Sequence, residues 1–165
     1  MEHLHFITTG GTIDKQYNTE KSTYDFSIGS PAVETILTRL PNKNFTHTIT
    51  EICKIDSLNM TIENRKEIKN ACEHSPSENI IITHGTDSMI ETAKYLSEHF
   101  TTKTIILTGA SQPEKFKQSD ADLNIGTAIG ATDILPQGVH IAIHGQIYKP
   151  REVFKNENGS FKLKK

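Results

Sequence analysis

The sequence predicts an α/β fold, in which a doubly wound, mostly parallel sheet carries helices on both faces. Two observations lead to this prediction. Short β-branched runs alternate with stretches of helical periodicity along the whole chain. A length of 165 residues suits one domain, and no repeat, low-complexity segment or linker composition divides it. We therefore expect residues 1–165 to form a single three-layer domain of the flavodoxin or Rossmann kind.

The first half of the chain contains two strand–helix pairs. We expect a strand at Leu4–Thr8 and then a helix at Pro31–Leu40, with Ser30 as its N-cap. A strand at Thr46–Ile55 precedes a helix at Thr61–Glu73. Apolar residues at helical spacing give each helix one buried face, formed by Val33, Ile36, Leu37 and Leu40 in the first and Ile62, Ile68, Ala71 and Cys72 in the second.

The second half repeats the alternation more clearly. Two β-branched runs, at Asn79–Thr83 and Thr104–Thr108, are predicted to be buried strands. Helices are expected at Ser88–His99 and within Asp120–Ala131. A last central strand is expected at Val139–Ile143. After a turn at His144-Gly145-Gln146, the chain is expected to form a short ribbon at Ile147-Tyr148.

One connection is far longer than the others. About twenty residues separate the first strand from Pro31, from Gly10 to Ser30, whereas such loops usually take two to six. A long segment without predicted structure in a compact domain is often a lid or a binding loop. Its polar and phenolic side chains, which include Tyr17 and Tyr24, favour that interpretation over an idle surface excursion.

Composition excludes several classes of protein. Hydrophobic residues make up 35% and charged residues 23%, with a formal net charge of −2, so long disorder and a basic field for nucleic acid are not expected. No run of eighteen apolar residues and no charged-then-apolar leader occurs, which predicts a cytoplasmic protein without a membrane segment. The basic stretch Phe161–Lys165 is interpreted as a solvated tail.

The cysteines and histidines give no metal motif. Two cysteines form no disulfide framework, and the eight histidines form no HExxH pair. His84 lies in a Thr-His-Gly-Thr-Asp segment, where a structural hydrogen bond is a better expectation than catalysis. A nucleotide site is also disfavoured, because Gly10-Gly11 is not followed by the G-x-G-x-x-G or GK[ST] spacing.

Three predicted strands end in threonine-bearing glycine corners: Thr9-Gly10-Gly11-Thr12, Thr83-His84-Gly85-Thr86-Asp87 and Thr108-Gly109-Ala110. The carboxyl ends of parallel strands lie along one edge of a sheet, so these corners are expected to face the same side. They bring together hydroxyl groups, a carboxylate and backbone N–H groups, at Gly11-Thr12 and Thr86-Asp87, that could form an oxyanion hole. This combination favours acyl-transfer chemistry.

The two longer corners resemble the signature segments of the bacterial-type L-asparaginase/glutaminase family. Further segments match that family in the same order, so the resemblance covers nearly the whole chain. They are Asp56-Ser57-Leu58-Asn59-Met60, Leu107-Thr108-Gly109-Ala110, Ser119-Asp120-Ala121-Asp122-Leu123-Asn124 and Arg151-Glu152-Val153-Phe154-Lys155. The resemblance implies hydrolysis of L-asparagine to L-aspartate and ammonia through a threonine acyl-enzyme, without cofactor or metal.

The same resemblance assigns the catalytic roles. Thr12 would be the nucleophile, assisted by Tyr24 of the long loop, and Thr86, Asp87 and Lys155 would form a second catalytic group. In the substrate-binding site, Ser57 and Asp87 would hold the α-carboxylate and the α-ammonium group, with contributions from Gly11 and Thr86. A homodimer or higher homo-oligomer is expected as well, because the family builds its sites near subunit contacts.

Two departures from the family pattern keep alternatives open. Leu58 stands where many members have a glutamine, and it cannot form a hydrogen bond to the substrate. Full-length members also carry a C-terminal domain, which we expect to be absent here. Glutamine or a larger amide therefore remains an alternative substrate, and a catalytically silent amino-acid-binding domain an alternative function.

Overall fold

The computed structural model describes residues 2–18 and 25–164 and confirms the predicted α/β fold. Its main sheet has six strands in the order β4-β1-β5-β6-β7-β8; the first five are parallel and β8 is antiparallel to β7. Their bounds are β1 Glu2–Gly10, β4 Phe45–Ile55, β5 Asn79–Thr83, β6 Thr104–Thr108, β7 Gly138–Ile143 and β8 Gln146–Tyr148. The three glycine corners therefore lie at one edge of the sheet, as predicted.

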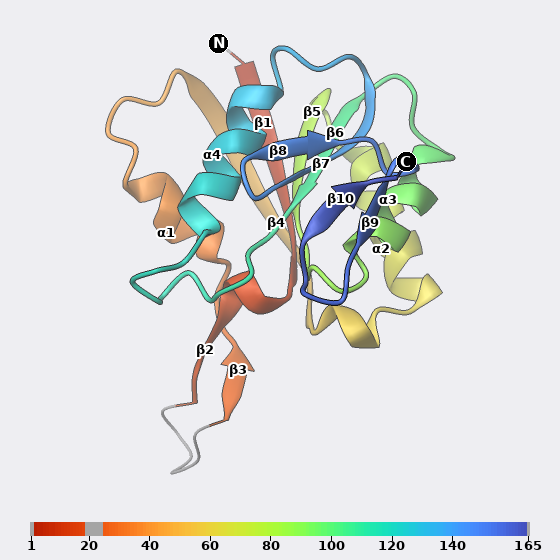
Figure 1. Cartoon of the computed structure of the whole chain (residues 1–165). Helices are drawn as coiled ribbons and strands as arrows, with labels where there is room; N and C mark the ends of the chain where they lie inside the picture. The colour runs from red at the N-terminus through yellow and green to blue at the C-terminus, as the bar shows by residue number, and fades with distance from the viewer. Residues whose placement is uncertain (1, 19–24, 165) are drawn as a thin grey trace.

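Helices cover both faces of this sheet (Figure 1). α1 (Ala32–Thr38) and α4 (Ala121–Ala131) pack on one face, against Leu4 and Phe6 of β1. α2 (Ile62–His74) and α3 (Met89–Ser97) pack on the other, against Ile7. Alternate side chains of a strand point to opposite faces, so a central strand buried on both sides reads as a continuous apolar run.

The C-terminal segment corrects one prediction. Phe161–Leu163 is strand β10, paired antiparallel with β9 (Val153–Lys155), and is not a solvated tail. Val153 and Phe161 are buried in the core on the α2/α3 side. Burial of these two apolar side chains fixes the hairpin, and with it Lys155, to the body of the domain.

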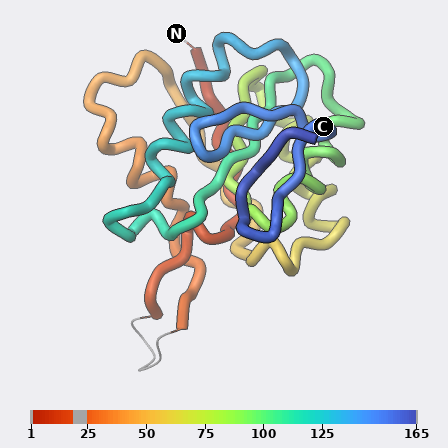
Figure 2. Tube along the Cα trace, viewed as in Figure 1, coloured from red at the N-terminus to blue at the C-terminus, as the bar shows by residue number. Residues whose placement is uncertain are grey.

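The long connection after β1 is also more ordered than predicted. Lys15–Tyr17 (β2) and Phe26–Ile28 (β3) form an antiparallel hairpin that extends from the body of the molecule (Figures 1 and 2). The rings of Tyr17 and Phe26 stack with their centroids 4.8 Å apart, and Phe116 lies against both. Tyr24, the predicted catalytic tyrosine, lies outside the described residues.

The start of α1 differs from the prediction as well. The helix begins at Ala32, and its first amide is bound by Asp14, whose Oδ1 accepts a hydrogen bond from Ala32 N at 2.7 Å. Ser30 is therefore not the capping residue. Leu40 and Ile62, predicted to face the core, are 40% and 45% exposed. Leu40 lies beyond the end of α1, and Ile62 is the first residue of α2.

Asp14 is buried, and the pKa of its carboxyl group makes the free energy of unfolding depend on pH. Burial raises the pKa of the carboxyl group to about 7, with further increases from Glu51 and Glu114 and a decrease from Lys54 and the Ala32 amide. A raised pKa means that the folded protein binds the proton more tightly than the unfolded chain. Asp14 therefore contributes stability below pH 4 that is lost as the pH rises toward 7.

We expect Asp14→Asn to gain stability relative to wild type as the pH rises from 4 to 8, by at most about 4 kcal/mol. Asparagine keeps an oxygen that accepts the Ala32 amide proton and removes the buried charge. Urea unfolding at pH 4, 6 and 8 measures the difference, with exposed Asp25→Asn as the control. A difference that does not change with pH would contradict this prediction.

Candidate active site

The first two glycine corners touch each other. Gly10 and Gly11 both have positive φ angles, 91° and 82°, which turn the chain sharply at the end of β1. A Cβ atom on Gly11 would lie 2.5 Å from the backbone nitrogen of Gly85, so this contact requires glycine. The segments that carry Thr12 and Thr86 are thus held side by side, as the sequence predicted.

A third segment, the short 3-10 helix η2 (Ser57–Asn59) after β4, completes this contact. Ser57 is buried, and its Oγ accepts a hydrogen bond from Asp87 N at 3.2 Å. In return, the hydroxyl of Ser88 donates to the Ser57 carbonyl at 2.5 Å. Leu58 follows directly and is 77% exposed, so its apolar side chain stands at the edge of the site.

Lys155 reaches the second corner from β9. Its Nζ donates hydrogen bonds to Thr86 Oγ1 at 3.0 Å and to Asp87 Oδ1 at 2.5 Å. The lysine side chain is 21% exposed and the aspartate side chain 45%. The hairpin packing described above brings this amine to a hydroxyl that lies 69 residues earlier in the chain.

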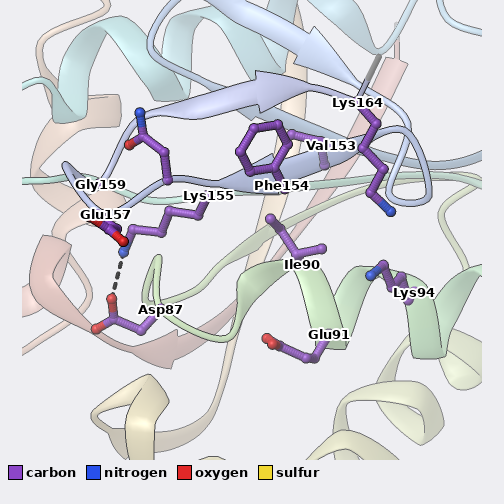
Figure 3. A pocket seen from close by; sticks show the side chains of 11 residues that line it. Asp87, Ile90, Glu91, Lys94, Val153, Phe154, Lys155, Glu157, Gly159 and Lys164 are labelled. Atoms are coloured by element: carbon purple, nitrogen blue, oxygen red, sulfur yellow. Dashed lines mark hydrogen bonds and ion pairs between the residues drawn. The ribbon is translucent and has the colours of Figure 1, made fainter.

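The three groups can perform a proton transfer. A lysine amine in its neutral form accepts the proton of a hydroxyl at hydrogen-bond distance, and the carboxylate stabilises the ammonium that results. In the ground state shown by this geometry, the ammonium ion is paired with Asp87 (Figure 3). Thr86 is therefore the hydroxyl group beside a lysine that acts as a base once it has lost its proton.

Thr12 has a different environment. It is the first residue of the 3-10 helix η1 (Thr12–Asp14), is partly exposed, and has no side-chain hydrogen bond to any described residue. Its turn is tied to the Ser57 segment by an ion pair of 2.7 Å between Lys15 and Asp56. The structure thus brings Ser57, Thr86, Asp87 and Lys155 into direct contact and places Thr12 beside them through Gly11.

Two of the four predicted oxyanion donors are already occupied. The Gly11 amide donates to Ile55 O at 3.0 Å, and the Asp87 amide donates to Ser57 Oγ. A donor that already serves a protein acceptor is not available to stabilise a developing oxyanion. This leaves the amides of Thr12 and Thr86 as the candidates.

The buried histidine of the second corner, His84, forms two hydrogen bonds that hold its ring in place. His84 Nδ1 donates to Gly85 O at 2.8 Å, so the neutral ring accepts at Nε2 from the Thr92 hydroxyl at 2.9 Å. Thr92 in turn accepts a hydrogen bond from Arg65 Nε at 3.0 Å. Burial lowers the pKa of His84 to about 4, which keeps the ring neutral at physiological pH. The structural role predicted for His84 agrees with these contacts, whereas Arg65 and Thr92 were not predicted from the sequence.

A cavity of about 460 Å³ lies beside the Lys155–Asp87 pair, between α3 and the β9–β10 hairpin (Figure 3). Ile90, Val153 and Phe154 contribute apolar surface, and Glu91 and Lys94 of α3 contribute charges. Thr12 and Ser57 do not line it. This cavity is therefore adjacent to the cluster of hydroxyl groups rather than part of it.

Residues 2–18 and 25–164 contain neither a candidate metal site nor a candidate membrane-spanning helix. No group of three or more His, Cys, Asp or Glu side chains in these ranges is arranged to hold a metal ion. Over the same residues, no helix has the length and apolar character needed to cross a bilayer.

Comparison with known proteins finds a matching family model and proteins of similar sequence and fold. Residues 3–163 match the family model described as "Asparaginase, N-terminal". The glutaminase-asparaginase of Acinetobacter glutaminasificans is 28% identical over 162 residues, which cover 92% of this chain and 49% of that protein.

Two solved structures are similar along nearly the whole chain. The thermostable L-asparaginase from Thermococcus kodakarensis has a TM-score of 0.85 at 23% identity, covering 98% of this chain and 51% of that one, which supports the fold alone. A probable cytoplasmic L-asparaginase from Campylobacter jejuni has a TM-score of 0.78 at 25% identity, covering 99% and 52%. The chain spans about half the length of these relatives.

Proposed function

Because the chain belongs to the asparaginase family, matching its N-terminal domain over residues 3–163, we propose that it hydrolyses L-asparagine to L-aspartate and ammonia. The observation that carries the proposal is the position of Lys155 Nζ, 3.0 Å from the Thr86 hydroxyl and 2.5 Å from the Asp87 carboxylate. A domain that only binds an amino acid does not need a base at a threonine hydroxyl. This observation argues against the silent-domain alternative.

The proposed reaction has two steps. Thr12 Oγ attacks the carboxamide carbon, the C–N bond breaks, and the hydroxyl proton leaves with the amide nitrogen as ammonia. A water molecule then attacks the acyl-threonine ester, gives one proton back to Thr12 Oγ, and releases aspartate. Tyr24 would assist the first step and the Thr86–Lys155–Asp87 group the second, while the amides of Thr12 and Thr86 stabilise the oxyanions.

Substrate binding is proposed at Ser57 and Asp87. Ser57 Oγ already accepts a hydrogen bond from the Asp87 amide, so its own hydroxyl proton can serve the α-carboxylate. Asp87 uses Oδ1 for Lys155, which leaves Oδ2 for the α-ammonium group. A cytoplasmic location and a homo-oligomeric state remain predictions, which cell fractionation and light scattering can test.

The test is ammonia release by the purified chain from L-asparagine, L-glutamine and D-asparagine. We expect turnover of L-asparagine, and a higher kcat/KM for it than for the other two amides. Higher activity on L-glutamine would favour the alternative substrate, which the exposed Leu58 beside Ser57 leaves open. Binding of L-asparagine in calorimetry without any ammonia would support the silent domain and overturn the proposal.

Leu58→Gln is expected to lower the KM for L-asparagine by about 3- to 10-fold, because the new amide can donate a hydrogen bond to the substrate. Steady-state kinetics of ammonia release measure this effect. The matched control is Leu40→Gln, another exposed leucine, at the far end of α1. An unchanged KM, or an equal change in both variants, would remove Leu58 from the binding site.

A further inference from the structure

The loop after β6 spans the two threonine corners. At one end, a Cβ atom on Gly109 would lie 2.2 Å from the carbonyl oxygen of His84, so this glycine is pressed against the β5 corner. At the other end, Glu114 N donates to Ile13 O at 3.0 Å, next to Thr12. Ser111 lies between these two contacts in the chain and is exposed, and the loop that carries it contacts both corners that form the proposed site.

Ser111 is paired with a histidine from the next strand. Its Oγ lies 2.8 Å from Nε2 of His144, the residue that follows β7. His144 and Gly145 both have positive φ angles, 52° and 71°, as a two-residue type I′ hairpin turn requires. The His144 ring also packs edge-on against Phe161, which pairs with Lys155 across the β9–β10 hairpin.

Asp120 and Asn124 hold this pair in place. Asp120 accepts hydrogen bonds from the amides of Ser111 and Gln112 and from the side chain of Asn124, at 2.9 to 3.1 Å. Buried Asn124 also donates to Gly109 O and accepts from His144 N. The pair is thus part of a built network and not two loose surface side chains.

The hydrogen bond between Ser111 and His144 leaves one donor of the pair unused. A neutral histidine and a serine carry two polar hydrogens, and their mutual bond uses one of them in either tautomer. The other is free to bind a ligand, since no further hydrogen bond of either side chain is formed within residues 2–18 and 25–164. The Asp120 carboxylate, 3.8 Å from Nε2, disfavours an anionic group here and leaves a neutral oxygen acceptor as the suitable ligand.

We propose that Ser111 and His144 form a leaving-group subsite, which binds a carbonyl or hydroxyl oxygen on the nitrogen substituent of an amide substrate. This inference rests on the proposed function. Strand order supports it, because Ser57 follows β4 on one flank of the threonine corners, while Ser111 and His144 follow β6 and β7 on the other. A substrate whose α-carboxylate is held at Ser57 and whose amide group lies at the threonine corners would extend toward this second flank. The substrate class then extends from asparagine to N-substituted β-aspartyl amides.

The test compares three substrates: L-asparagine, β-L-aspartylglycinamide, which carries an acceptor carbonyl, and the nearly isosteric β-L-aspartyl isobutylamide, which does not. Wild type is expected to prefer the glycinamide over the isobutylamide in kcat/KM. Ser111→Ala and His144→Asn should lower this preference about tenfold and change kcat/KM for asparagine less than twofold. Asparagine suits the type I′ turn, so His144→Asn retains the fold.

The control is His99→Asn, an exposed histidine beyond the end of α3, which should leave all three rates unchanged. Equal losses on all three substrates would show that Ser111 and His144 only support the structure, and would overturn the subsite. Turnover of asparagine without preference between the two substituted amides would overturn it as well. Failure to hydrolyse any of the amides would instead contradict the proposed function, and the subsite with it.

Discussion

Replacing Thr12 by alanine is expected to lower kcat for ammonia release from L-asparagine by about 10³-fold or more. The hydroxyl oxygen is the proposed attacking atom, and alanine removes it. Thr12 Oγ has no hydrogen bond to a described residue, so its loss removes no hydrogen bond within residues 2–18 and 25–164. The variant should therefore fold normally and fail in catalysis.

Two measurements separate this role from that of the other threonine. Mass spectrometry after rapid acid quench should detect an acyl group on Thr12 in wild type and none in Thr12→Ala. Thr12→Ser should retain measurable turnover, and Thr127→Ala, which removes a hydroxyl that donates to Leu123 O, should retain all of it. An acyl group on Thr86 in place of Thr12 would exchange the roles of the two threonines in the mechanism.

The central strands were predictable because burial on both faces leaves a simple pattern. Asn79–Thr83 and Thr104–Thr108 consist almost entirely of isoleucine, leucine and threonine, and the structure gives them those same bounds. Strands β9 and β10 have three residues each, and Phe161 stands in a basic stretch. Their pairing depends on a tertiary contact with the core, which no local pattern reports.

The capping of α1 also depends on a tertiary contact that the local sequence does not report. A local rule selects Ser30 as the N-cap, but Asp14, 18 residues away, reaches the first amide once the hairpin has closed. Long-range contacts of this kind override local capping preferences. The β2–β3 hairpin that produces the contact was itself hidden within a segment that reads as a loop.

Within the candidate site, the residue types were predictable and their geometry was not. The corners ending in Thr12 and Thr86 follow directly from strands, so the sheet alone brings them together. Lys155 was assigned by family resemblance, since 69 residues separate it from Thr86. Ser111 and His144 are 33 residues apart and lie in segments with no motif spacing, so only the structure pairs them.

Replacing Lys155 by methionine is expected to lower kcat by about 10²- to 10⁴-fold, because Thr86 loses the base that takes its proton. Methionine retains most of the length of the side chain and removes the amine. Thr86→Ala should cause a loss of similar size, since the base is useless without the hydroxyl. Steady-state ammonia release for both single variants measures these effects.

The double variant decides whether the two residues act as one unit. If Lys155 and Thr86 share a single proton transfer, Lys155→Met/Thr86→Ala should be no slower than the slower single variant, within about threefold. Independent contributions would instead multiply the two losses. The matched control is Lys162→Met, an exposed lysine on the neighbouring strand of the same hairpin, which should retain wild-type activity. A multiplied loss, or an equal loss in the Lys162 variant, would mean that Lys155 serves the hairpin and not the Thr86 hydroxyl.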